Sequence, residues 1–346
     1  MKESKKTSPF AWKLIWPLLL LLFILVGVAA GSAWHLHNFY VTPKADANLK
    51  VIYTVSRGQG FGTTARQLKM AGLCTSEKKL RFIAALYGYD KKIKAGEYLL
   101  SGSMSPKVLL EVLTSGKVYL HKLTIPEGYT VKQIAAAVEK AGLGDAQRLT
   151  KLALSPKAPA RMGLPDAPPT LEGYLFPDTY LFEKSVTEEA ILQAMVRRFN
   201  AVFTQEIIAQ GKALGLSANE IITLASIIEK ETGAAHERAI ISSVFHNRLK
   251  KRMRLETDPT VIYGIKDFNG NITRKDLRRK TPYNTYVIKG LPPGPIASPG
   301  LAAIKAAVNP EKTPFLYFVS KKDGTHHFSR TIREHRKAVR RYQLKR

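Results

Sequence analysis

The sequence predicts an α+β protein that is exported and held at a membrane by one N-terminal helix. Three observations carry this prediction. An uncharged apolar segment covers residues 14–34, short β runs alternate with amphipathic helices over residues 49–145, and helical patterns alternate with Pro- and Gly-rich loops from residue 171 onward. With 346 residues, 45% of them hydrophobic, the chain is long enough for two or three folded units.

The charge of the chain points to a polyanionic partner. Lys and Arg number 54 against 27 Asp and Glu, which gives a formal net charge of +27. The excess is uneven, because residues 246–280 hold eleven Lys and Arg against four acids, and residues 321–346 hold ten against two. Nucleic acid, anionic lipid and an acidic wall polymer all fit such a charge. The single cysteine, Cys74, allows no internal disulfide.

The apolar segment 14–34 predicts a transmembrane anchor. As a helix it would span about 32 Å, enough to cross a hydrocarbon core of ~30 Å. Lysines precede it, at positions 2, 5, 6 and 13, so the positive-inside tendency places residues 1–13 in the cytoplasm and the remainder outside. The alternative is a signal peptide cleaved near Gly31-Ser32-Ala33. Both interpretations export the folded part and therefore exclude nucleic acid as the partner.

An internal repeat follows a connector, residues 35–48, in which we expect few core residues. Residues 55–73 align without gaps on residues 125–143. Each copy reads as a β run, a Gly turn, a helix and an Ala-Gly-Leu stop, which predicts one compact α+β unit or two related ones. Such a unit is either a binding module or a spacer. Farther along, residues 155–170 form a proline-rich loop, and residues 187–214 show a long helical stretch.

The helix predicted over residues 220–230 carries the clearest candidate for chemistry. Ser217 and Glu220 form a capping-box pattern at its start. Its apolar face consists of Ile221, Leu224, Ile227 and Ile228, and Glu231 projects onto the same face. Because burial disfavours a charged carboxylate, the pKa of Glu231 should be raised, as a general acid requires. The alternative is a structural Glu held by a neighbouring Arg.

Loops rich in Asn, Asp and Tyr follow this helix and suit hydroxyl-rich sugars. They cover residues 255–264, 283–286 and 290–300. The histidines are scattered, and the adjacent pair His326-His327 falls in a predicted hairpin with its two side chains on opposite faces. We therefore expect no metal site and no cofactor.

The motifs over residues 171–330 resemble, in order, those of the endolytic murein transglycosylase MltG (YceG-like) family. They are 171-LEGYLFPDTY-180, 225-ASIIEKET-232, 247-NRL-249, 257-TDPTVIYG-264, 283-YNTY-286 and 290-GLPPGPIASP-299. The resemblance implies the following domains: a cytoplasmic N-terminus (1–13), a transmembrane anchor (14–34), a connector (35–48), a LysM-like subdomain (49–118), and a YceG-like catalytic domain with a basic tail (119–346). Residues 115–145, the second repeat copy among them, fit either of the last two.

The resemblance also implies an activity. The chain would be a lyase that cuts the β-1,4 bond between N-acetylmuramic acid and N-acetylglucosamine in nascent peptidoglycan strands, leaving 1,6-anhydro ends and ending strand elongation. It would act as a single-pass protein of the plasma (inner) membrane with a periplasmic catalytic domain. Its partners would be glycan strands, and the family allows peptidoglycan synthases and division proteins as well.

Site residues follow from the matched motifs. The catalytic Glu of the family corresponds to Glu231, which the apolar-face argument selects independently, and Glu229 is the alternative. The expected substrate-binding residues are Asn247, Asn284, Tyr286, Asp258, Tyr263 and Glu172. A non-catalytic peptidoglycan-binding or division scaffold with the same fold is the competing function.

Overall fold

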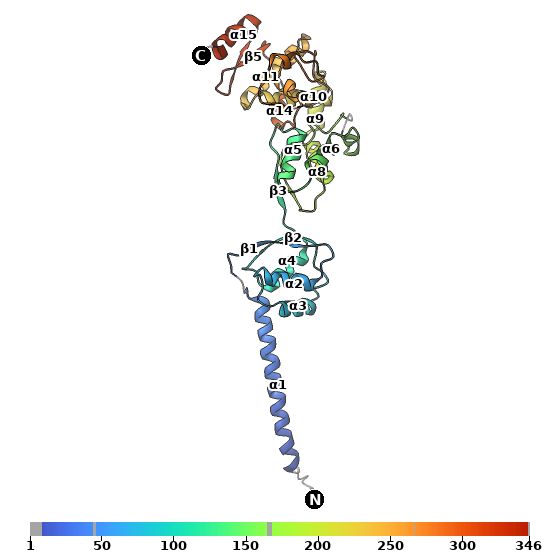
Figure 1. Cartoon of the computed structure of the whole chain (residues 1–346), viewed down its shortest axis with the longest axis vertical. Coiled ribbons are helices and arrows are strands. Elements are labelled where there is room, and N and C mark those ends of the chain that lie inside the picture. The colour runs from blue at the N-terminus through green and yellow to red at the C-terminus, as the bar shows by residue number, and fades with distance from the viewer. Residues whose placement is uncertain (1–8, 44–45, 165–167, 267, 345–346) are drawn as a thin grey trace. The chain divides into compact units, whose positions relative to one another are not determined.

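The computed structural model describes residues 9–43, 46–164, 168–266 and 268–344 (Figure 1). The chain divides into two compact units, and the division falls between Leu120 and His121. The two copies of the predicted repeat therefore lie in different units, and residues 121–145 belong to the second. The predicted domain bounds, and the assignment of residues 49–118 to a LysM-like subdomain, remain predictions.

The first unit is a long helix followed by a small α+β fold. Its elements are α1 (Pro9–Val41), β1 (Lys50–Val55), α2 (Phe61–Met70), α3 (Glu77–Leu86), β2 (Gly96–Ser101) and α4 (Pro106–Ser115). β1 and β2 pair antiparallel, with Tyr53 opposite Tyr98. The buried faces of α2, α3 and α4 form one apolar core with the two strands.

The helix α1 is longer than the predicted anchor. Residues Ile15–Val41 are long and apolar enough to cross a membrane, and residues 15–35 of this stretch are exposed. The helix continues into the predicted connector, where Phe39 and Tyr40 are buried in the core of the first unit. Among the described residues of 35–48 these two aromatic side chains are the buried apolar ones, which agrees with the expectation of few core residues; both lie on the last turn of α1, which packs on α3 and α4.

The second unit contains the remaining elements. They are β3 (His121–Thr124), α5 (Val131–Lys140), α6 (Ala146–Ala153), α7 (Ala158–Arg161), β4 (Thr179–Phe182), α8 (Glu188–Val202), α9 (Gln205–Ala213), α10 (Ala218–Glu231), η1 (Ala235–Glu237), α11 (Arg238–Lys250), α12 (Asp258–Tyr263), α13 (Arg274–Arg278), α14 (Leu301–Val308), β5 (Tyr317–Ser320), β6 (His326–Ser329), α15 (Ile332–Val339) and η2 (Arg340–Leu344). β3 pairs with β4 and β5 with β6, both antiparallel.

The repeat is confirmed at the level of local structure. The ungapped alignment places α2 exactly on α5. The turn glycines Gly58 and Gly128 have φ of 77° and 75°, and Gly72 and Gly142, which end the two helices, have φ of 74° and 67°. Only glycine adopts these backbone conformations without strain, which explains their recurrence.

Two other expectations about helices need correction. The stretch 187–214 is two helices, because the chain leaves α8 at Phe203 and Thr204 caps the start of α9 by accepting a hydrogen bond from the Ile207 amide. The loop predicted over residues 155–170 contains the single turn α7, with Pro159 in its first turn, where a missing N–H costs least.

The helix α10 lies at the centre of the second unit. It packs against α9, α11, α12 and α14, and its residues Ile221, Leu224, Ile227 and Ile228 are fully buried. The predicted capping box at its start is present, since the Ser217 hydroxyl accepts from the Glu220 amide and the Glu220 carboxylate accepts from the Ser217 amide. Glu231 is its last residue, so the centre of the core leads directly to this carboxyl.

Candidate active site

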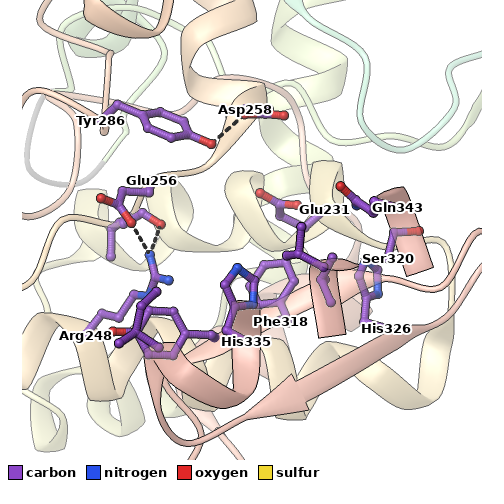
Figure 2. A pocket seen from close by; sticks show the side chains of 15 residues that line it. Glu231, Arg248, Glu256, Asp258, Tyr286, Phe318, Ser320, His326, His335 and Gln343 are labelled. Carbon is purple, nitrogen blue, oxygen red and sulfur yellow. Dashed lines mark hydrogen bonds and ion pairs between the residues drawn. The ribbon is translucent and has the colours of Figure 1, made fainter. Parts of the chain in front are cut away.

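Glu231 ends α10 with its carboxyl in a pocket of about 400 Å³ (Figure 2). Burial raises the pKa of Glu231 to about 7, in the direction predicted from the sequence. The hydrogen bond from the Thr257 hydroxyl and the charge of Arg248 lower this pKa, and the charge of Asp258 raises it. A carboxyl with such a pKa holds a proton at neutral pH and can also release it.

A buried set of threonines holds the group that contacts Glu231. The Thr257 hydroxyl donates a hydrogen bond to Glu231 Oε1. The Thr257 amide donates to the Thr285 hydroxyl at 3.1 Å, and the Thr260 hydroxyl donates to the Thr257 carbonyl at 2.7 Å. All three threonines are buried, and the Thr285 and Thr260 hydroxyls hold the main chain of Thr257 and thereby position its hydroxyl.

The pocket has two walls. One comes from α10, α12 and the loops around Glu256 and Tyr286, and the other comes from the hairpin β5–β6, α15 and η2. The lining residues are Glu231, Arg248, Leu255, Glu256, Asp258, Tyr286, Tyr317, Phe318, Val319, Ser320, His326, Ile332, His335, Val339 and Gln343. Carboxylates, hydroxyls and aromatic rings thus surround one carboxyl, an arrangement that suits a polar ligand with apolar ring faces.

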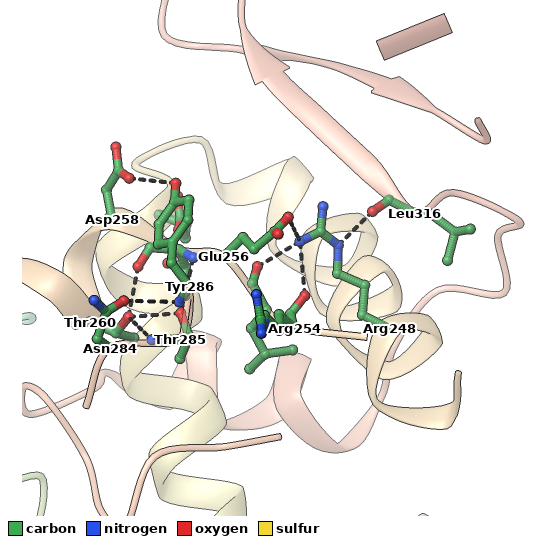
Figure 3. Close-up of polar contacts among 12 residues, drawn as sticks. Arg248, Arg254, Glu256, Asp258, Thr260, Asn284, Thr285, Tyr286 and Leu316 are labelled. Atoms are coloured by element: carbon green, nitrogen blue, oxygen red, sulfur yellow. Dashed lines mark hydrogen bonds and ion pairs between the residues drawn. The ribbon is translucent and has the colours of Figure 1, made fainter. Parts of the chain in front are cut away.

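Three of the predicted site residues meet in this pocket. Asp258 and Tyr286 line it together with Glu231, and the Tyr286 hydroxyl donates to Asp258 Oδ1 at 2.7 Å (Figures 2 and 3). Asp258 is the first residue of α12, so its carboxylate lies where the positive end of the helix stabilises it.

Asn247 and Asn284 lie outside the residues that line this pocket, and their amides are used within the protein. Asn247 Nδ2 donates to the carbonyls of Thr313 at 2.8 Å and Phe315 at 2.9 Å. Asn284 is 1% exposed, and its Nδ2 donates to the carbonyls of Asp276, Leu277 and Arg279. Each side chain therefore holds a loop, and Asn247 also lines a separate hollow of about 610 Å³.

Glu172 and Tyr263 form a second polar cluster, apart from the pocket. Glu172 Oε1 accepts from the Val131 amide at 3.0 Å and thereby caps α5, while Oε2 accepts from the Tyr263 hydroxyl at 3.2 Å. Glu172 is 5% exposed, and burial raises its pKa to about 7. This carboxyl has the altered pKa of a functional group, but its two oxygens are occupied by the protein.

Glu229, the alternative catalytic residue, points to a different neighbourhood. Its Oε2 accepts from the Gly300 amide at 3.0 Å, and its Oε1 lies 3.6 Å from Arg238 Nη2. Its side chain is 7% exposed and does not line the pocket of Glu231. The geometry therefore favours Glu231, because its carboxyl lines this pocket while that of Glu229 is bonded to Gly300 and lies beside Arg238.

Arg248 was missed by the sequence analysis and joins the two walls of the pocket. Its Nη1 donates to the Leu255 carbonyl and its Nε to the Leu316 carbonyl, both at 2.7 Å (Figure 3). The guanidinium lies over the ring of Tyr317. The motif 247-NRL-249 led us to predict Asn247. Which of the adjacent residues Asn247 and Arg248 faces the pocket depends on how α11 is rotated about its axis.

His326 was also missed as a lining residue. Its Nδ1 lies 2.6 Å from Glu237 Oε2, and its amide donates to Glu237 Oε1 at 2.8 Å. The predicted hairpin is confirmed, and the ring of its neighbour His327 contacts Tyr342 instead. Within the described residues, no three His, Cys, Asp or Glu side chains are grouped closely enough to hold a metal ion.

Comparison with known proteins identifies the family. The model of the YceG-like family matches residues 53–341. An endolytic murein transglycosylase of Bacillus subtilis is 34% identical over 316 residues, covering 86% of this chain and 86% of the relative. One from Streptococcus pneumoniae strain D39 is 34% identical over 309 residues, and the match covers 80% of this chain and 55% of the relative.

A solved structure agrees with this assignment. The crystal structure of a yceG-like protein from Listeria monocytogenes has 33% sequence identity and a TM-score of 0.59, and the match covers 83% of this chain and 98% of that one. The family model covers most of the chain, the resemblance seen in the motifs is confirmed, and this chain belongs to the YceG-like family.

Proposed function

We propose that this chain is an endolytic peptidoglycan lytic transglycosylase, a lyase that cuts the β-1,4 bond between N-acetylmuramic acid and N-acetylglucosamine in nascent strands. The observation that carries the proposal is the carboxyl of Glu231, whose pKa burial raises to about 7 in a pocket lined by polar and aromatic groups. The names of the Bacillus and Streptococcus relatives support the same activity.

One carboxyl can perform both proton transfers of this reaction. Protonated Glu231 gives its proton to the glycosidic oxygen, and the bond from that oxygen to C1 of the muramic acid breaks. The Glu231 carboxylate then takes the proton of the C6 hydroxyl, and the C6 oxygen bonds to C1. The products are a free hydroxyl on N-acetylglucosamine and a 1,6-anhydro ring, with no water consumed. A pKa near 7 suits both steps, since neither form of the acid is rare at neutral pH.

Other residues of the pocket receive supporting roles in this proposal. Asp258 and Tyr286 orient sugar hydroxyls, and the charge of Asp258 also stabilises positive charge that develops at C1. Asn247 and Asn284 act indirectly, through the loops that their amides hold. Glu172 and Tyr263 fix the start of α5 against α12.

We place the enzyme at the plasma membrane, with α1 as a single-pass anchor. The length and apolar character of Ile15–Val41 support an anchor. The lysines before it favour a cytoplasmic N-terminus and a catalytic unit outside the membrane, where nascent strands lie. Synthases and division proteins are the protein partners proposed for this location, and the first unit is proposed as a LysM-like module.

The competing proposal, a scaffold without activity, is separated from the enzyme by one substitution. Wild-type protein, Glu231→Gln and Glu229→Gln are each incubated with uncrosslinked strands, and anhydro ends are measured by mass spectrometry. We expect product from wild type and from Glu229→Gln, and a loss of at least about 10²-fold with Glu231→Gln. Equal product from wild type and Glu231→Gln would reject the assignment of Glu231. Absence of product from wild type would favour the scaffold.

A further inference from the structure

The helix α13 and the residue after it form a cluster of exposed cations. We call Arg274, Lys275, Arg278 and Arg279 the basic turn. All four are exposed, and together with Asp276 they line one surface hollow. None of the four is in an ion pair with any residue that the structure describes. Asp276, which is bonded to Thr273 in the capping box of α13, feels the charges of Arg279 and Lys275, which lower its pKa. Four cations beside this one described acid leave positive charge for a ligand.

The basic turn is held in place by a side chain that also contacts the rim of the pocket. Asn284 Nδ2 donates to the carbonyls of Asp276 at 3.2 Å, Leu277 at 3.1 Å and Arg279 at 2.7 Å. Its Oδ1 accepts from the amide of Tyr286 at 3.0 Å (Figure 3). Because Asn284 is 1% exposed, one buried amide fixes the turn on one side and the segment that carries Tyr286 on the other.

The hydrogen bonds of Asn284 restrict which anion the basic turn can bind. A surface fixed in this way to the segment that carries Tyr286 keeps its position relative to the pocket, so one extended ligand can contact both. Under the function proposed above, that molecule is a glycan strand whose muramic acids carry peptides with carboxylates. Three of the four cations are arginines, whose guanidinium groups bind carboxylates through two parallel hydrogen bonds.

We propose that the basic turn binds peptide carboxylates of the strand whose glycan is cut at Glu231, and thereby contributes to substrate binding. The inference rests on the proposed function. It assigns the turn a role in binding and none in the proton transfers, so its loss should raise KM and leave kcat nearly unchanged. A membrane surface is a different anionic partner, and the experiment below separates it.

The test compares two sets of four neutralised cations in the full-length protein. One variant changes Arg274, Lys275, Arg278 and Arg279 to Gln. The matched control changes Lys140, Lys151, Lys157 and Arg161 to Gln, which are four exposed cations of the same unit on other elements. Both variants lose the same net charge. Rates of anhydro-end formation are measured on uncrosslinked strands with peptides, at low and at near-physiological ionic strength, and on strands freed of peptides by an amidase.

We expect the basic-turn variant to raise KM about tenfold at low salt on strands with peptides, since each exposed charge contact contributes a fraction of 1 kcal/mol. The wild-type advantage should shrink with salt and vanish on strands without peptides. The control should resemble wild type. Equal KM values for the two variants, or the same loss on strands without peptides, would overturn the inference.

Two further measurements separate the alternatives. Binding to vesicles of anionic phospholipid is compared for both variants, and a loss confined to the basic-turn variant, with KM for strands unchanged, would make the turn a membrane contact and overturn the inference. If wild type forms no anhydro ends, the proposed function fails. Co-sedimentation of strands with Glu231→Gln, with and without the basic-turn substitutions, then still reports on binding, and equal sedimentation would overturn the inference as well.

Discussion

The hydroxyl of Thr257, the residue before α12, donates a hydrogen bond to the carboxyl of Glu231 at the end of α10. This bond favours the ionised carboxylate and opposes the effect of burial, which raises the pKa of Glu231. The balance of the two effects keeps the acid able to give and to take a proton.

Replacing Thr257 with Val should therefore raise the pKa of Glu231 further. The catalytic step needs the protonated acid in the free enzyme, so the alkaline limb of kcat/KM against pH should move to higher pH. The rate at neutral pH should fall by about tenfold, because the carboxyl also loses a contact that orients it. Thr257→Ser keeps the hydroxyl and serves as the control. An unmoved alkaline limb in Thr257→Val would contradict the role given to this bond.

Asp258→Asn should move the alkaline limb of kcat/KM against pH to lower pH. The charge of Asp258 raises the pKa of Glu231, so its removal lowers that pKa and moves the limb to lower pH. Tyr286→Phe removes the 2.7 Å hydrogen bond to Asp258 but leaves the charge, and it should raise KM by about 3- to 10-fold with the limb in place. Profiles of kcat/KM against pH for both variants and for the double variant measure the effect of the Asp258 charge and that of the Tyr286 hydrogen bond. Identical profiles for the two single variants would show that the charge of Asp258 does not set the pKa of Glu231.

Glu237 should contribute to stability through His326. Glu237→Ala leaves the amide and ring of the partly buried His326 without their acceptors, which should lower the free energy of unfolding by about 1–3 kcal/mol. Glu237→Gln keeps one acceptor oxygen and should cost less. Urea unfolding measures the difference, with the exposed Glu183→Ala as control. A loss as small as that of the control would show that the pair does not hold the hairpin.

Glu172 should make the stability of the protein depend on pH. Burial raises its folded-state pKa from 4.5 to about 7, so ionisation is unfavourable in the folded state. Its contribution is complete below about pH 4.5 and is lost as the pH rises to about 7, a change on the order of 3 kcal/mol.

Glu172→Gln stays neutral and should match wild type at low pH and exceed it at about pH 8. The curve of unfolding free energy against pH tests this, with the exposed Glu206→Gln as control. Parallel curves for wild type and Glu172→Gln would exclude such a dependence.

The sequence was sufficient to predict the parts of the fold that follow from local periodicity. The capping box at Ser217, the buried face of α10 and the Gly turns of the repeat all depend on residues close together in the chain. Glu231 could be predicted for the same reason, since its position follows from the periodicity of the helix that it ends. Asp258 and Tyr286 were predicted as site residues from the resemblance of their motifs to the family. That the two side chains contact each other could be learned only from the structure.

The rest could not be predicted because it depends on which side of a loop a side chain faces. Asn284 was expected at the substrate, and its amide donates to the carbonyls of Asp276, Leu277 and Arg279, in α13 and the residue after it. Arg248 and His326 reach the pocket from segments about 80 residues apart, and their partners Leu316 and Glu237 are equally distant in the chain. Such tertiary pairing leaves no periodic signal in one sequence.

The hydrogen bonds of Arg248 have a kinetic consequence. One guanidinium binds the Leu255 carbonyl of one wall and the Leu316 carbonyl of the other, so hydrogen bonds within the protein hold the two walls at a set width. Substrate that enters such an opening spends little binding energy on ordering it. Mixing experiments should then record a single association phase for a glycan strand, whereas Arg248→Lys should add a slower unimolecular phase as the two walls come together.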